Sequence, residues 1–222
     1  MKKISELRYA AFGDSITYGV DHRLQYKKMP HPYPELVAEK LGFAEVKNLG
    51  VSGATLVTGR EGRACMTERI LAYNAPADVI SILLGVNDYA DSSPLGAPDD
   101  KGLLSVYGAL DAALSYLTAT YPDAYIFIMT PYEARISGVY HTVPNKDGYA
   151  LSELRDAIVT VAERYSVPVL DLFTAGGFAE EIEMPFSDGI HPTPDFVARR
   201  TAPDIAAFLE GELSAFLSKS GK

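Results

Sequence analysis

The sequence has no tryptophan and only one cysteine, Cys65, among its 222 residues. A single cysteine excludes an intrachain disulfide, so we expect Cys65 to pack as a small core residue. No apolar run approaches the ~18 residues that a membrane-spanning helix needs, and we expect no membrane partner. Near the N-terminus, Glu6 and Arg8 interrupt the apolar stretch that a signal peptide requires. As it stands, the sequence predicts a cytoplasmic protein.

Positive charge is also scarce. The chain has 20 lysines and arginines against 29 aspartates and glutamates, a formal net charge of −9. Such a surface repels a phosphate backbone, so we expect no nucleic-acid partner. The four histidines show no metal-ligand spacing, and neither a phosphate-binding loop nor a G-x-G-x-x-G motif is present. We therefore expect no metal and no other cofactor.

Strand-like and helix-like segments alternate along the whole chain. Apolar runs predict strands at 8–12, 44–48, 78–84, 125–129 and 167–172. Apolar stripes at helical spacing predict helices at 34–41, 64–73, 103–117, 151–165 and 193–217, with Pro203 expected to kink or split the last one. Five such units require a parallel sheet with helices on both faces. The prediction is one doubly wound α/β domain spanning residues 1–222.

In such a domain, the loops after the strands meet at one edge of the sheet, where open α/β folds bind ligands. The loops after the first three predicted strands carry Ser15, Gly53 and Asn87, and Asp188 and His191 follow the fifth strand and a short helix, at the same edge. A serine hydrolase needs a nucleophile, a base, a carboxylate that orients the base, and oxyanion donors. His191 would take the Ser15 proton, and Asp188 would orient the imidazole. The Ser15 amide, the Gly53 amide and the Asn87 side chain would hold the oxyanion.

Each of these segments also has a purely structural interpretation. Asp14 and Ser15 suit the cap of a following helix, and Asp188-Gly189 is a common turn dipeptide. A rival nucleophile, Ser52, lies in Gly50-Val51-Ser52-Gly53-Ala54, which loosely resembles the nucleophile elbow of α/β-hydrolases. That elbow normally follows several strands, whereas only two precede Ser52. The order of the segments, each after the expected strand, favours Ser15.

The segments resemble the four blocks of the SGNH hydrolases, also called the GDSL esterase/lipase family: Gly13-Asp14-Ser15-Ile16, Gly53, Gly85-Val86-Asn87-Asp88 and Asp188-Gly189-Ile190-His191. The blocks fall in the family's order and span nearly the whole chain. The resemblance implies Ser15, Asp188 and His191 as the catalytic triad. It also implies an oxyanion hole of Ser15, Gly53 and Asn87, and a flavodoxin-like α/β/α sandwich with five parallel strands. Ile16 replaces the family's leucine, an apolar exchange that leaves the chemistry intact.

The substrate is less determined than the reaction. The family hydrolyses many esters and thioesters, and no extended apolar lid is visible in the sequence. We expect a short-acyl, acetyl-type esterase that acts on a carbohydrate or other small-molecule ester. Tyr18, Tyr89 and Tyr140 are candidates for substrate contacts. The alternatives are a thioesterase or lysophospholipase-type acylhydrolase and, in a different class, a catalytically silent binding module with the same fold.

Overall fold

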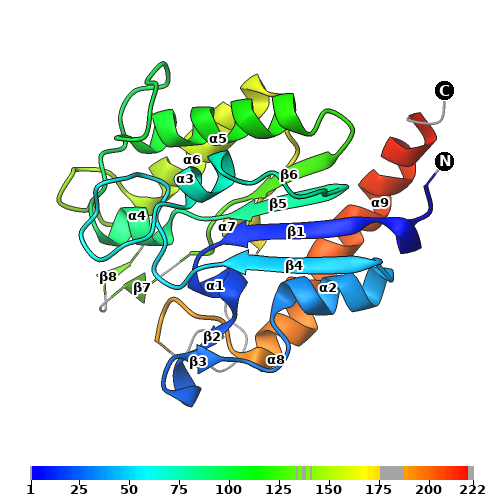
Figure 1. Cartoon of the computed structure of the whole chain (residues 1–222). Helices are drawn as coiled ribbons and strands as arrows, with labels where there is room; N and C mark the ends of the chain where they lie inside the picture. The colour runs from blue at the N-terminus through cyan, green and yellow to red at the C-terminus, as the bar shows by residue number, and fades with distance from the viewer. Residues whose placement is uncertain (1, 134, 137–138, 141, 176–187, 220–222) are drawn as a thin grey trace.

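The computed structural model describes residues 2–133, 135–136, 139–140, 142–175 and 188–219. Its centre is a five-stranded parallel sheet in the order β4-β1-β5-β6-β9. The strands are β1 (Arg8–Gly13), β4 (Glu45–Gly50), β5 (Val79–Leu83), β6 (Tyr125–Met129) and β9 (Val169–Leu170). Helices cover both faces of this sheet, as Figure 1 shows. The predicted α/β/α fold is confirmed.

The register of the sheet decides where its loops begin. β1 lies between β4 and β5, and Gly13 at its end pairs with both Gly50 and Leu83. The loops after these three strands therefore start at the same level on the carboxyl edge. After β4 the chain crosses to the other side of β1, so β1 and β5 flank the point where the strand order reverses. Ligands of open α/β sheets bind at such a point.

The helices form two layers. On one face α5 (Val106–Thr120) packs between α3 (Met66–Leu71) and α6 (Leu151–Arg164), and on the other α2 (Tyr33–Leu41) packs against α9 (Ala202–Lys219). The stripe predicted for the long helix is buried at Leu110, Leu114 and Leu117. That helix begins later than predicted because the Ser105 side chain caps it by accepting from the Gly108 amide. In the described part of the chain, no helix is both long and apolar enough to cross a membrane.

Several short elements differ from the prediction. Between the first predicted strand and the first predicted helix, the chain forms a hairpin of β2 (Val20–Asp21) and β3 (Lys27–Lys28), joined by the 3₁₀ turn η2 (His22–Leu24). The fifth strand is shorter than predicted: Pro168, before its first residue, has no N–H to donate to the sheet, and the next helix begins at Leu172, two residues after the strand ends. The remaining short elements are η1 (Ile4–Glu6), α1 (Ser15–Tyr18), α4 (Val86–Ala90), β7 (Arg135–Ile136), β8 (Val139–Tyr140) and α7 (Leu172–Ala175).

The C-terminal helix is interrupted near Pro203, as expected. It runs as α8 (Pro194–Phe196), a π-helical segment η3 (Val197–Thr201) and α9. Pro203 is the second residue of α9 and lacks the N–H that would continue the regular ladder across this point. The interruption therefore has a local cause in the sequence.

Candidate active site

Ser15 lies where β1 ends. A Cβ on Gly13 would lie 1.9 Å from the Thr17 hydroxyl oxygen and 2.6 Å from the Leu83 carbonyl oxygen, so only glycine fits this turn. Asp14 caps the one-turn helix α1, its carboxylate accepting from the Ile16 amide at 2.9 Å. Ser15 is the first residue of that helix and is 4% exposed. The turn thus fixes the serine at the carboxyl edge of the sheet.

The end of the chain brings a histidine to this serine. His191 Nε2 lies 2.8 Å from Ser15 Oγ, and His191 Nδ1 lies 2.7 Å from Asp188 Oδ2. A carboxylate accepts hydrogen bonds, so it favours the tautomer with the proton on Nδ1. Nε2 is then free to accept the serine proton. We refer to these three side chains as the Ser15–His191–Asp188 array.

Asp188 divides its two oxygens between backbone and imidazole. Its Oδ1 accepts from the backbone amides of Ile190 at 3.0 Å and His191 at 2.8 Å, leaving Oδ2 for the ring. Burial alone would raise the pKa of Asp188, but the bonds from the His191 amide and ring and the Ile190 amide outweigh it, and the pKa is lowered. The carboxylate therefore stays ionised beside the imidazole.

The loops that carry Gly53 and Asn87 begin at the same carboxyl edge of the sheet as the turn that carries Ser15. Gly53 has φ +76° in a turn closed by the Ala54 amide bonding to the Val51 carbonyl at 3.0 Å, a position that favours glycine. The Asn87 side-chain amide donates to the Ala54 carbonyl at 2.9 Å. One hydrogen of that amide thus joins the loops after β4 and β5, and among the described residues the second hydrogen has no hydrogen-bond partner.

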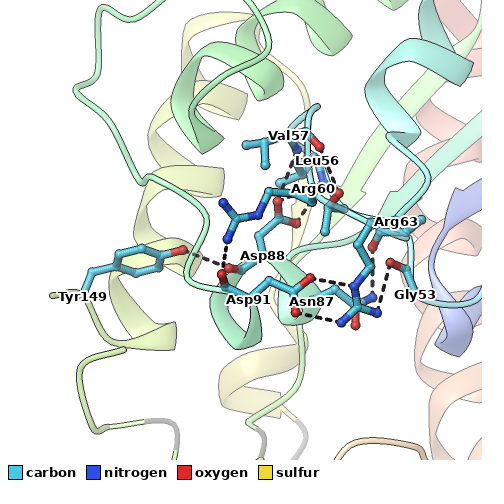
Figure 2. A network of polar contacts seen from close by, with 11 residues as sticks. Gly53, Leu56, Val57, Arg60, Arg63, Asn87, Asp88, Asp91 and Tyr149 are labelled. Carbon is cyan, nitrogen blue, oxygen red and sulfur yellow. Dashed lines mark hydrogen bonds and ion pairs between the residues drawn. The ribbon is translucent and has the colours of Figure 1, made fainter. Parts of the chain in front are cut away.

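Arg63 contacts both the Gly53 turn and Asp91 (Figure 2). Arg63 Nε and Nη2 form a forked pair with the Asp91 carboxylate at 2.6 and 2.7 Å, and Nη1 lies 3.4 Å from the Gly53 carbonyl oxygen. The two donors of the fork fix the guanidinium plane as well as its position. Arg60 donates to the Asp91 backbone carbonyl in the same network.

Asp14 and Asp88, which belong to the segments that carry Ser15 and Asn87, are fully buried. Asp88 accepts from the Leu56 amide at 2.9 Å and the Val57 amide at 3.2 Å, which ties α4 to the chain after the Gly53 turn. Burial raises the pKa of Asp88 to about 6. Burial also raises the pKa of Asp14 to about 7, and the nearby Asp88 charge adds to that effect.

The tyrosines singled out from the sequence have different surroundings. Tyr18 is partly exposed at the end of α1, with Lys28 Nζ 5.4 Å from its ring centroid. Tyr89 is only 4% exposed and donates its hydroxyl to the Val143 carbonyl at 2.6 Å, a position typical of packing. Tyr140 lies in β8, and its side chain is outside the described part of the structure.

The structure adds three observations about the site: the position of the rival serine, an arginine–aspartate pair and a tyrosine, the last two of which were not predicted. Ser52, the rival nucleophile, is exposed on the Gly53 turn, whereas the Ser15 oxygen contacts the histidine. Arg63 and Asp91 were not predicted, because the two positions are 28 residues apart and neither belongs to a motif. Tyr26, which lies beside His191, was not predicted either.

The fold and the array place the chain in a known class of acylhydrolases. Residues 11–198 match the GDSL-like lipase/acylhydrolase family, and the chain belongs to this family. A search of curated proteins gave no match. The predicted family is therefore confirmed at the level of acylhydrolases.

Solved structures share the fold over nearly the full length. A protein from Lactobacillus plantarum is 27% identical, with a TM-score of 0.79 over 93% of this chain and 98% of that one. A carbohydrate acetylesterase family member from Sinorhizobium meliloti is 19% identical, with a TM-score of 0.60 over 92% and 99% of the two chains. The aryl esterase of M. smegmatis is also 19% identical, with a TM-score of 0.62 and the same coverage.

Proposed function

We propose that this acylhydrolase is a serine esterase that cleaves carboxylic esters through an acyl-enzyme. The observation that carries the proposal is the continuous hydrogen-bonded array, with Ser15 Oγ 2.8 Å from His191 Nε2 and His191 Nδ1 2.7 Å from Asp188. A nucleophile, a base and an orienting carboxylate are within hydrogen-bond reach of one another, as this chemistry requires.

In the first half of the reaction, Ser15 Oγ bonds to the ester carbonyl carbon while His191 Nε2 takes the hydroxyl proton. The carbonyl oxygen becomes negative and is held by the Ser15 amide, the Gly53 amide and the second side-chain N–H of Asn87. The C–O bond to the alcohol then breaks, and the leaving oxygen takes the proton from His191. The Asp188 carboxylate stabilises the imidazolium that forms between these two transfers.

The second half repeats these steps with water. His191 Nε2 accepts a proton from a water molecule, whose oxygen bonds to the acyl carbon. The bond from that carbon to Ser15 Oγ breaks, and the serine oxygen recovers its proton from the imidazolium. The products are a carboxylic acid and an alcohol, and the enzyme returns to its starting state.

We further propose a short acyl group, carried by a carbohydrate or another small-molecule ester. The support is the sequence, in which no long apolar segment is available to line a channel for a fatty chain. Among the described residues, the exposed large apolar side chains are Tyr18, Leu24, Tyr26, Leu104 and Val143. The neighbours named as a carbohydrate acetylesterase and an aryl esterase agree with this class of substrate.

A fluorophosphonate probe tests the mechanism, because it labels only a serine whose hydroxyl is activated. We expect labelling of the wild-type chain and of Ser52→Ala, and loss of both labelling and ester turnover in Ser15→Ala. Ser52→Ala is a matched control because that serine lies on a neighbouring loop of the same edge. Labelling that persists in Ser15→Ala and disappears in Ser52→Ala would overturn the assignment. An unlabelled wild-type chain would favour the binding-module alternative.

The acyl preference is tested separately by comparing p-nitrophenyl acetate with p-nitrophenyl octanoate. We expect the higher kcat/KM for the acetate. A preference for the octanoate would reject the short-acyl proposal and favour a lysophospholipase-type acylhydrolase, while a preference for acetyl thioesters over acetyl esters would favour a thioesterase. Neither result would affect the role of Ser15.

A further inference from the structure

The β2–β3 hairpin holds an exposed tyrosine in an unusual backbone conformation. Gln25 and Tyr26 both have positive φ, at 57° and 62°. This region is unfavourable for a bulky side chain, and such strain persists only where surrounding bonds enforce it. Here the Gln25 amide bonds to the His22 carbonyl at 3.0 Å and the Tyr26 amide to the Asp21 carbonyl at 3.1 Å. The turn therefore sets the direction of the Tyr26 side chain.

That direction brings Tyr26 to the histidine of the array. The Tyr26 and His191 ring centroids are 6.0 Å apart with an interplanar angle of 78°, and the Tyr26 and His22 centroids are 5.1 Å apart at 77°. Both distances and angles are those of edge-to-face aromatic pairs. Tyr26 nevertheless remains 59% exposed. It is thus positioned by two neighbouring rings while most of its surface faces outward.

Because the Tyr26 ring lies beside His191, the role of His191 indicates which part of an ester Tyr26 would contact. His191 Nε2 must give its proton to the leaving oxygen, so the alcohol part of the ester lies against the imidazole. The proposed oxyanion donors Gly53 and Asn87 come from other loops, after β4 and β5. In Figure 1 the hairpin lies below α1, next to the orange segment that precedes α8 and carries His191.

We propose that Tyr26 is a specificity residue that packs against a ring in the alcohol part of the substrate. This inference rests on the proposed esterase function and adds to it the class of leaving group, a cyclic alcohol with a flat face. An aryl ring and a sugar ring share this shape, and both would cover apolar surface of the exposed tyrosine. The acyl group does not contact Tyr26 in this arrangement.

The test varies the alcohol and keeps the acetyl group constant. Phenyl acetate and an acetylated glucose have ring alcohols, whereas vinyl acetate is an activated ester with a small leaving group. Tyr26→Asn removes the ring and suits the backbone, because asparagine adopts positive φ more readily than tyrosine. Tyr26→Phe keeps the ring, and Leu24→Ala is a matched control at a residue of the same hairpin that is 43% exposed.

We expect Tyr26→Asn to lower kcat/KM for one or both ring substrates by about tenfold and to change it little for vinyl acetate. Tyr26→Phe and Leu24→Ala should retain the wild-type ratio. The two ring substrates distinguish an aryl from a sugar preference by which of them loses more. Equal losses on all three esters, no loss on either ring substrate, or a Phe variant as impaired as the Asn variant would overturn the inference. A wild-type chain that hydrolyses none of the esters would instead overturn the proposed function.

Discussion

Ser15 and His191 are 176 positions apart, and each is held by hydrogen bonds within its own short segment. Asp14 caps the turn that carries the serine, and Asp188 accepts two backbone amides of the turn that carries the histidine. Each aspartate thus stabilises its own turn by accepting hydrogen bonds from backbone amides of that turn. The contact between the two segments then needs only the sheet to bring their loops to one edge. The site therefore consists of two turns, each fixed by its own local hydrogen bonds.

Asn87→Ala should lower kcat by roughly 10²–10³, the usual loss for one oxyanion donor, with a smaller change in KM. The physical reason is that the donor acts on charge that develops in the transition state. Asn145→Ala is a matched control, because the Asn145 amide donates to the Tyr89 carbonyl at 3.0 Å and so serves packing. It should change thermal stability more than kcat. An unchanged kcat in steady-state assays of Asn87→Ala would remove this residue from the oxyanion hole.

The sequence alone identifies the members of the array but not the residues around them. Ser15, Asp188 and His191 belong to short motifs whose place after a strand can be predicted. The position of Tyr26 depends on positive φ angles at two consecutive residues, Gln25 and Tyr26. Neither residue is a glycine, so the sequence does not indicate this conformation. Arg63 depends on a contact with a residue on a different loop. A short sequence motif indicates neither a backbone conformation of this kind nor a contact between two loops.

Helices and strands likewise can be predicted only where a local pattern indicates them. The central strands and long helices are predictable because each has a sustained apolar run or stripe, as in 125–129, which is β6 without change. The β2–β3 hairpin has two residues in each strand, too few to show any alternation. Its pairing depends on bonds such as the Met29 amide to the Gly19 carbonyl at 2.7 Å, which only the folded chain reveals.

The loop after β4 should depend on Arg63 for its catalytic geometry. Releasing the forked pair with Asp91 frees the Gly53 turn, so the proposed oxyanion amide would lose its alignment. We expect Arg63→Gln to lower kcat by about tenfold, or about 1.4 kcal/mol in the activation free energy, with little change in KM. Arg69→Gln, at an exposed arginine of α3, is the control and should behave as wild type.

Asp91→Asn should give the same defect as Arg63→Gln. Because both changes release one contact, the double variant should be no slower than the slower single variant. Steady-state kinetics of the four proteins measure this directly. Additive losses would show that the two residues act separately, and an increase confined to KM would indicate that Arg63 contacts the substrate instead.

The carboxyl groups whose pKa values are shifted form two sets with opposite effects on stability. Asp171 has its pKa lowered to about 2, since bonds from Arg155 and two threonines outweigh its burial, and the pKa of Asp188 is also lowered. Their contribution is present above the ordinary value of about 3.9 and is lost as the pH falls below it. Asp14 and Asp88 behave in the opposite way, because burial raises the pKa of each.

A carboxyl group with a raised pKa binds its proton more tightly in the folded chain than in the unfolded one. The folded state therefore loses stability as the pH rises from about 3.9 through the folded pKa values of Asp88, about 6, and Asp14, about 7. Together the two sets predict greatest stability in weak acid. The proposed esterase reaction, in contrast, requires the neutral form of His191 as its base. The conditions that best stabilise the fold and those that best support turnover should differ.

Urea unfolding between about pH 4.5 and about pH 8.5 tests this, and we expect the free energy of unfolding to fall by at least about 1 kcal/mol over that range. Asp14→Asn should flatten the decline, because asparagine can still accept from the Ile16 amide but has no proton to release. Asp123→Asn, at an exposed aspartate, should leave the slope unchanged. Two outcomes would contradict the proposal that the buried Asp14 carboxyl group causes this pH dependence. One is a free energy of unfolding that increases as the pH rises, and the other is a wild-type slope in Asp14→Asn.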